Sequence, residues 1–96
     1  MATYVILTQI DHDAFLPPRD FKAIAERVSA EVKRQCPNVR WKDSYATLGH
    51  FDAVDIIESD DPLAVERAVL IIRGYGHATT QTLPATPWHE FVARLQ

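Results

Sequence analysis

The chain has 96 residues, of which 47% are hydrophobic and 24% charged, and its formal net charge is −3. This size allows a single domain over residues 1–96, and the composition is that of an ordinary globular protein. The acidic balance argues against a nucleic-acid partner. Cys36 is the one cysteine, which excludes an internal disulfide and fits a reducing compartment. No apolar run is long enough to span a membrane, so we predict a cytoplasmic protein.

The first half of the chain predicts a strand, a helix and a second strand. The first strand is TYVILTQI (3–10), which is rich in β-branched residues and stops at DHDAFLPP. A helix over 20–36 follows and ends at Pro37. The spacing of its apolar residues by three and four defines a buried arc of Phe21, Ile24, Ala25, Val28, Val32 and Cys36. VRWKDSYATL (39–48) alternates as a strand, with Val39, Trp41, Asp43 and Tyr45 on one side.

The second half repeats the pattern. Gly49 marks a turn, and HFDAVDIIE (50–58) returns as the other strand of a hairpin. SDDPLAVERAVLIIRG (59–74) predicts a helix with Asp61 as N-cap, Pro62 at the first position and Gly74 as terminator. GHATTQTL (76–83) is a fourth strand, and PWHEFVARLQ (87–96) is a short last helix. The buried arc of the second main helix is predicted to be Ala64, Val65, Ala68, Val69, Ile71 and Ile72.

The order strand, helix, strand, strand, helix, strand predicts an α+β, ferredoxin-like βαββαβ domain with a four-stranded antiparallel sheet. Both main helices cover the same face of that sheet. The strands are nevertheless mostly apolar on both sides, as Ile6 and Leu7 of the first strand and Ile56 and Ile57 of the third show, and two helices can cover only one side. Because a bare apolar sheet is unusual for a monomer, we predict that a second copy packs there and forms a homodimer.

Two leucines of the second helix, Leu63 and Leu70, project away from its buried arc. We expect the last helix to cover them in part, since scattered surface leucines are common. The alternative is a second interface that builds a larger oligomer.

At the hairpin the chain resembles the GYD-domain family, which is named for a Gly-Tyr-Asp type signature. The corresponding residues here are Gly49, Phe51 and Asp52, with His50 inserted. The resemblance covers essentially the whole chain and implies a ferredoxin-like fold and dimeric α+β barrels, without a settled activity. Phe51 departs from the tyrosine of the signature and lacks its hydroxyl. A similar hairpin occurs in the effector-binding domains of Lrp/AsnC-type regulators, whose DNA-binding part has no counterpart here.

Two aspartates stand in the otherwise apolar return strand. Asp52 follows the turn, where a carboxylate typically caps backbone N–H groups of the hairpin; ligand contact is the alternative. Asp55 lies between apolar neighbours and cannot be buried as a charge without a partner. It either pairs with a cation or accepts hydrogen bonds in a polar cavity, and such a carboxylate can serve as an acid or base. Alternation places the two aspartates on opposite faces of the sheet.

The histidines have a structural and a functional interpretation. His50 and His77 belong to the turn and to the start of the fourth strand, where a polar surface role is common. In the functional interpretation one of them forms a proton-transfer pair with Asp55 or Tyr45. The segment Asp11, His12 and Asp13 predicts a solvated turn, because three adjacent residues cannot easily converge on one metal ion. We predict no metal and no cofactor.

Trp41 and Tyr45 share a predicted face and pack in the core or an interface, or they wall a pocket for a flat organic ligand. Thr79, Thr80 and Thr82 could supply hydroxyls to such a pocket. Cys36 is interpreted as a packing residue. The candidate ligand-contacting residues are Trp41, Tyr45, Gly49, His50, Phe51, Asp52, Asp55 and His77, and the catalytic candidates among them are Asp55, His50 and His77.

These features predict a homo-oligomeric α+β barrel that binds a small molecule between sheet and helices or at the interface. The alternative is a cofactor-independent enzyme of the same barrel type, such as a monooxygenase, isomerase or lyase, that uses Asp55 with a histidine as acid and base. A third interpretation is an assembly module without a ligand. A pocket filled by side chains, with Asp55 in an ion pair, would favour that third interpretation.

Overall fold

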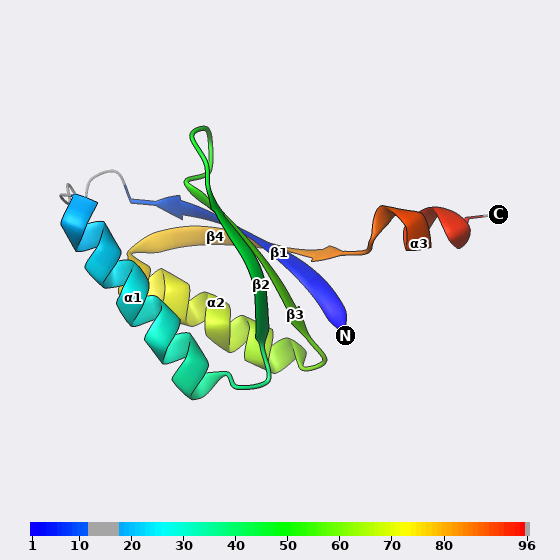
Figure 1. Cartoon of the computed structure of the whole chain (residues 1–96), viewed down its shortest axis with the longest axis horizontal. Helices are drawn as coiled ribbons and strands as arrows, with labels where there is room; N and C mark the ends of the chain where they lie inside the picture. Colours follow the sequence, from blue (N-terminus) through cyan, green and yellow to red (C-terminus); the bar gives the residue numbers. More distant parts are fainter. Residues whose placement is uncertain (12–17, 96) are drawn as a thin grey trace.

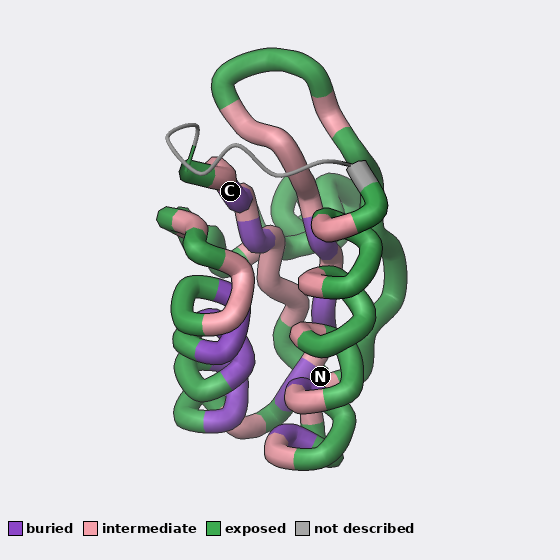
Figure 2. The backbone as a smooth tube through the Cα atoms, turned by 90° about the vertical axis from the view of Figure 1, so that its left-hand side faces the viewer, coloured by how far each residue is buried: buried purple, intermediate pink, exposed green. Residues whose placement is uncertain are grey.

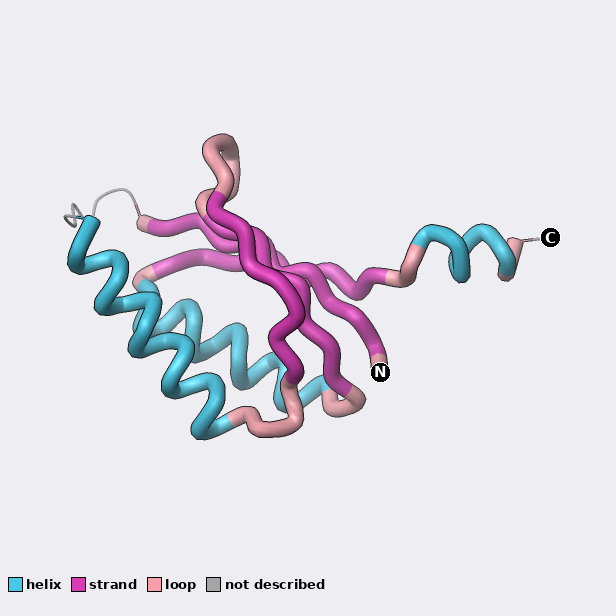
Figure 3. Tube along the Cα trace, viewed as in Figure 1, coloured by secondary structure: helices cyan, strands magenta, loops and turns pink. Residues whose placement is uncertain are grey.

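The computed structural model describes residues 1–11 and 18–95, with elements in the order strand, helix, strand, strand, helix, strand, helix (Figures 1 and 3). The elements are β1 (Ala2–Ile10), α1 (Pro18–Gln35), β2 (Arg40–Ala46), β3 (Ala53–Ser59), α2 (Pro62–Gly76), β4 (Ala78–Ala85) and α3 (Trp88–Ala93). The sheet is antiparallel with the order β2-β3-β1-β4. The predicted α+β fold is therefore confirmed. His12 and Asp13, which the sequence assigns to a turn, lie outside the described residues.

The helices α1 and α2 lie side by side on one face of the sheet (Figure 1). The core lies mainly under α2, and Figure 2 shows most of the buried backbone there and on the strands that face it. All six residues of the predicted buried arc of α2 are buried. One cluster joins Ile6, Ile57, Val65, Val69 and Ile72, and a second joins Val32, Cys36, Ala68 and Ile71. Burial raises the pKa of the Cys36 thiol, which agrees with a packing role.

The start of α2 follows its sequence signals, but its end does not. Asp61 is the N-cap, with Oδ1 accepting from the amide of Leu63 at 3.0 Å, and Pro62 begins the helix. The prediction that Gly74 ends α2 is wrong. The helix continues to Gly76, and His77 takes the left-handed cap conformation with φ 49°. The ring of Tyr75 packs against the second cluster and lies under the Arg27 guanidinium, 4.4 Å away, so packing against α1 extends the helix.

The strand β2 contains a β-bulge between Trp41 and Asp43. Trp41 pairs with Ile57 and Ser44 with Asp55, so both share the face toward the helices. Tyr45 pairs with Val54 and lies on the other face. The prediction that Trp41 and Tyr45 share one face is therefore wrong, because the extra residue of the bulge reverses the alternation.

The side of the sheet away from α1 and α2 is called the open face here. It carries Val5, Leu7, Tyr45, Val54, Ile56 and Leu83. No element of the described chain covers it (Figure 1). Tyr45 is 57% and Leu83 44% exposed. The sequence prediction that the two helices leave one apolar face uncovered is confirmed within this single chain.

The helix α3 extends away from the sheet and has no buried residue (Figure 1). Leu63 and Leu70 of α2 are 73% and 65% exposed, so the expectation that the last helix covers them is wrong. The short helix follows the end of β4, and its direction carries it past the edge of the domain instead of back over α2. Its apolar residues Trp88, Phe91 and Val92 are exposed as well.

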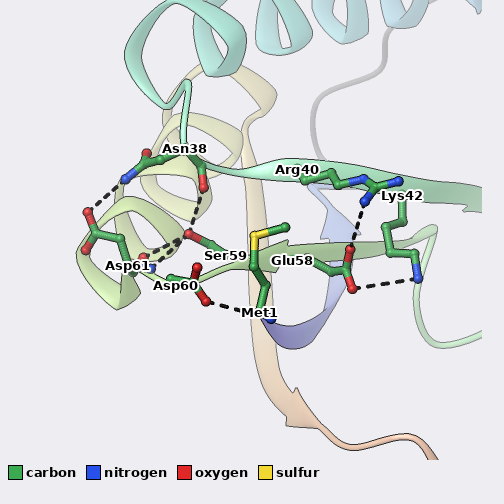
Figure 4. Close-up of polar contacts among 8 residues, drawn as sticks. All are labelled: Met1, Asn38, Arg40, Lys42, Glu58, Ser59, Asp60 and Asp61. Carbon is green, nitrogen blue, oxygen red and sulfur yellow. Dashed lines mark hydrogen bonds and ion pairs between the residues drawn. The ribbon is translucent and has the colours of Figure 1, made fainter.

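Polar contacts close the end of the sheet where α2 begins (Figure 4). The buried hydroxyl of Ser59 donates to the carbonyl of Asn38 at 2.9 Å and accepts from the amide of Asp61 at 3.0 Å. On the open face, the Glu58 carboxylate lies 3.7 Å from Arg40 and 3.8 Å from Lys42. These contacts fix the β2–β3 pair at one end, and the candidate site lies toward the other.

Candidate functional site

Asp55 faces the helices and is 9% exposed. Its Oδ1 accepts from the hydroxyl of Ser44 at 2.5 Å and from the indole Nε1 of Trp41 at 3.2 Å. Trp41 Nε1 also lies 2.7 Å from Ser44 Oγ, so the three side chains form a closed polar cluster. Both donors are neutral, and no described lysine or arginine forms an ion pair with Asp55. Of the two predicted environments for Asp55, the structure supports hydrogen bonding in a polar cavity.

The polar cluster lines a cavity of about 590 Å³ between α1 and the sheet. The cavity runs along the N-terminal half of the predicted arc of α1, and Val28 and Val32 border it as well. Val32 and Cys36 are buried and Val28 is half-buried, whereas Phe21 and Ala25 remain exposed and, with Ile24, line the cavity. The part of the arc that no described residue covers is thus the part that faces this space. The size and the mostly apolar walls are typical of small-molecule sites.

A second polar group of the wall is the hydroxyl of Thr8. Thr8 is 5% exposed, and no described residue forms a hydrogen bond with its Oγ1. In the β1–β3 register Ile6 pairs with Asp55 and Thr8 with Ala53, so Thr8 and Asp55 are diagonal neighbours on one face. Leaving a buried hydroxyl unsatisfied costs about 1–3 kcal/mol. The cavity therefore has an unused hydrogen-bonding atom close to a carboxylate.

The hairpin signature residues have a structural role at the sheet end. Asp52 Oδ2 accepts from the amide of Ile10 at 2.8 Å, and the amide of Asp52 donates to Thr8 O at 2.8 Å. Asp52 thus caps a backbone N–H group as predicted, but the amide belongs to β1 and not to the hairpin. The hydroxyl of Thr47 donates to Phe51 O at 2.7 Å, across the loop that contains Gly49. The ring of His50 meets the edge of Phe51 with centroids 4.9 Å apart.

The structure does not bring the two candidate histidines to Asp55. His50 is exposed in the β2–β3 loop, and His77 is exposed at the end of α2. Neither lines the cavity that contains Asp55. His77 instead borders a shallower hollow of about 480 Å³ with Asp11 and Arg73. Of the two aromatic candidates of β2, Trp41 lines the cavity and Tyr45 lies on the open face.

Sequence reasoning missed Thr8 and Ser44 as site residues. Thr8 gave a signal, because it is the polar residue on the apolar side of β1, although threonine is common in strands. Ser44 gave none, since the bulge moves it to the face of Asp55. Among the described residues no group of three or more His, Cys, Asp and Glu side chains could hold a metal ion. In the described part, no helix is both long and apolar enough to cross a membrane.

The fold and this site place the chain among the ferredoxin-like α+β proteins. The family model of the GYD domain matches residues 4–95, and the chain belongs to the GYD-domain family. A relative from Thermus thermophilus, the glutamine synthetase and cystathionine beta-lyase binding protein, is 31% identical over the full length of both chains.

Two solved structures share the fold. The leucine response regulatory protein of Mycobacterium tuberculosis matches with a TM-score of 0.61 at 15% identity, over 90% of this chain and 51% of the regulator. This chain therefore spans about half the length of that regulator. The de novo designed protein Foldit4 matches with a TM-score of 0.53 at 19% identity, over 91% of this chain and 99% of the design.

The contact between Ser44 and Asp55 predicts a specific loss of stability. We expect Ser44→Ala to lower the free energy of unfolding by about 1–3 kcal/mol, because a buried carboxylate loses its short hydroxyl donor. Urea denaturation measures the change. Ser29→Ala, at an exposed position of α1, is the control and should stay within about 0.5 kcal/mol of wild type. Equal effects of the two substitutions would show that the Ser44–Asp55 bond contributes nothing.

Proposed function

We propose that this chain is a small-molecule-binding protein that works as a homodimeric α+β barrel. One observation carries the binding part: the apolar arc of α1 faces a cavity of about 590 Å³ where its own sheet presents Asp55, Ser44 and Thr8. A helix that only stabilised the fold would lie directly on the sheet with this arc buried. Among the described residues, nothing covers this arc and none forms a hydrogen bond with the Thr8 hydroxyl, and both observations favour a bound molecule in this space.

The open face supports the dimeric part of the proposal. Its apolar residues come from all four strands, and burying such a face against a copy of itself gives a symmetric interface. The exposed apolar residues of α3 extend beyond the sheet, in reach of a partner subunit. In this arrangement the ligand cavity lies on the outer side of each sheet, under its own helices.

The alternative of a cofactor-independent enzyme has less support. It pairs Asp55 with His50 or His77 as acid and base, and no described histidine lines the cavity of Asp55. Proton transfer requires the two groups to reach the same substrate atom. The proposal is therefore binding without catalysis.

A second candidate function is the binding of a partner enzyme. The observation that favours it is the name of the Thermus thermophilus relative, which describes binding of glutamine synthetase and cystathionine beta-lyase. The outer surface of α2, with the exposed Leu63 and Leu70 on either side of Arg67, offers an apolar contact area that the proposed dimer does not use. Binding of a small molecule and binding of an enzyme use different surfaces in this scheme, so both can hold.

The dimer proposal predicts a strong effect of one charge on the open face. We expect Leu83→Lys to shift the protein from dimer to monomer at micromolar concentration, because the ammonium would be buried against the partner sheet. Light scattering after size-exclusion chromatography measures the mass.

Leu63→Lys is the matched control for that substitution, since it places the same charge on the outer surface of α2. The dimer should survive this change. A wild-type protein that is monomeric at micromolar concentration would contradict the proposed assembly.

The binding proposal predicts that filling the cavity abolishes ligand binding. Ala25 lines the cavity, whereas Ala23 lies on the same helix and does not. In a thermal-shift screen against a metabolite library, we expect stabilising compounds for wild type and for Ala23→Phe. We expect the same compounds to have no effect on Ala25→Phe. Compounds that stabilise both variants equally would place the binding site elsewhere, and the absence of any stabilising compound would contradict the function.

A further inference from the structure

The chemistry of the cavity wall narrows the class of ligand, and this inference rests on the proposed binding function. Most of the wall is apolar and comes from α1 and the facing side chains of the sheet and α2, including Ile24, Val28 and Ile72. The polar groups gather on the sheet side, at Thr8, Ser44 and Asp55. A ligand that fits this distribution has an apolar body and one polar head.

The polar head must be a hydrogen-bond donor. Asp55 receives both of its described bonds at Oδ1, from Ser44 and Trp41, and no described group donates to Oδ2. A carboxylate oxygen can only accept. The hydroxyl of Thr8 is also without a partner among the described residues and can accept a further bond. Asp55 Oδ2 and Thr8 Oγ1, on one face of the sheet, can therefore each accept a hydrogen bond from a ligand.

The head must also be compatible with a buried negative charge. A buried carboxylate with only neutral partners is costly, and a cation in contact with it offsets much of that cost. Lys33 is the cationic side chain among the described wall residues, and it is exposed on α1 and makes no ion pair with Asp55. The described residues therefore place no cation at the polar end of the cavity.

We propose that this cavity binds a primary amine with an apolar body. Its ammonium group lies between the side chains of Thr8 and Asp55. These residues are diagonal neighbours on adjacent antiparallel strands, where Cα atoms are typically about 7–8 Å apart. An ammonium has three donors, enough for Asp55 Oδ2 and Thr8 Oγ1 together. The hydrocarbon or aromatic body lies under the uncovered arc of α1. A carboxylic acid of the same shape is excluded by repulsion from Asp55.

Isothermal titration of the full-length protein at neutral pH tests the assignment with two sets of probes. 2-Phenylethylamine is compared with 2-phenylethanol and phenylacetate, and hexylamine with hexanol and hexanoate. We expect each amine to bind about tenfold or more tightly than its alcohol, and each acid to bind worst. Asp55→Asn keeps an acceptor for Ser44 and Trp41 and should bring the affinities of amine and alcohol to the same value.

Thr8→Val is a second variant that preserves shape and removes the unpartnered hydroxyl. We expect it to weaken amine binding about tenfold or more while the unfolding midpoint stays equal or rises. Thr79→Val, on an exposed position of β4, is the control and should bind as wild type does.

The outcomes separate this inference from the proposed function. Equal affinity of amine and alcohol for wild type, or amine preference retained in Asp55→Asn, would overturn the amine assignment while the binding function stands. If every probe failed to bind but the metabolite screen found compounds blocked by Ala25→Phe, the amine assignment alone would fail. If neither the probes nor the screen showed binding, both would fail.

Discussion

A carboxylate on the helix-facing side of a central strand is the constraint on which this site depends. Asp55 is buried, so it requires donors from its own sheet, and these come from Ser44 and Trp41 of the neighbouring strand. Only the bulge in β2 brings both side chains to that face. This polar patch lies in the sheet wall that faces the first half of α1, beside apolar residues such as Ile10 and Ala53. The helix packs on α2 through its second half and leaves a cavity above Asp55.

The two faces of the sheet have different roles in the proposed function. The helix side combines the core under α2 with the cavity under α1. The open face is apolar at its centre, and polar residues surround this centre, including Asp43, Gln81 and the charged end at Glu58, Arg40 and Lys42. In the proposed function one face binds the ligand and the other forms the dimer. Separating them allows a ligand to bind without rearranging the proposed interface, and it leaves the outer surface of α2 available for a different partner.

The sequence predicted most of the fold because hydrophobic periodicity reports local packing directly. The arc of α2 and the uncovered apolar face follow from spacing, and the N-cap follows from the residue types of Asp61 and Pro62. The site was only partly predictable. Asp55 could be recognised as a polar residue out of place, but its partners could not, since a β-bulge inverts alternation without a clear signal in VRWKDSYATL. The end of α2 was missed for a similar reason, because packing of Tyr75 against α1 outweighed Gly74.

The apolar arc of α1 shows that helical spacing of apolar residues can indicate a ligand-facing surface as well as a protein core. Phe21, Ile24 and Ala25 continue the spacing of Val28 and Val32, and periodicity alone assigns all of them to the core. In the structure the first three line an open space instead. Apolar spacing shows that a helix face is to be kept from water, but it does not distinguish a protein core from a ligand as the cover.

Native mass spectrometry of the protein isolated from its own host tests the central claim most directly, since it reports subunit number and retained small molecules together. The account predicts two chains that carry an added small-molecule mass, and the loss of that mass when Ala25→Phe fills the cavity. A bare single chain, or an added mass that persists in Ala25→Phe, would contradict it.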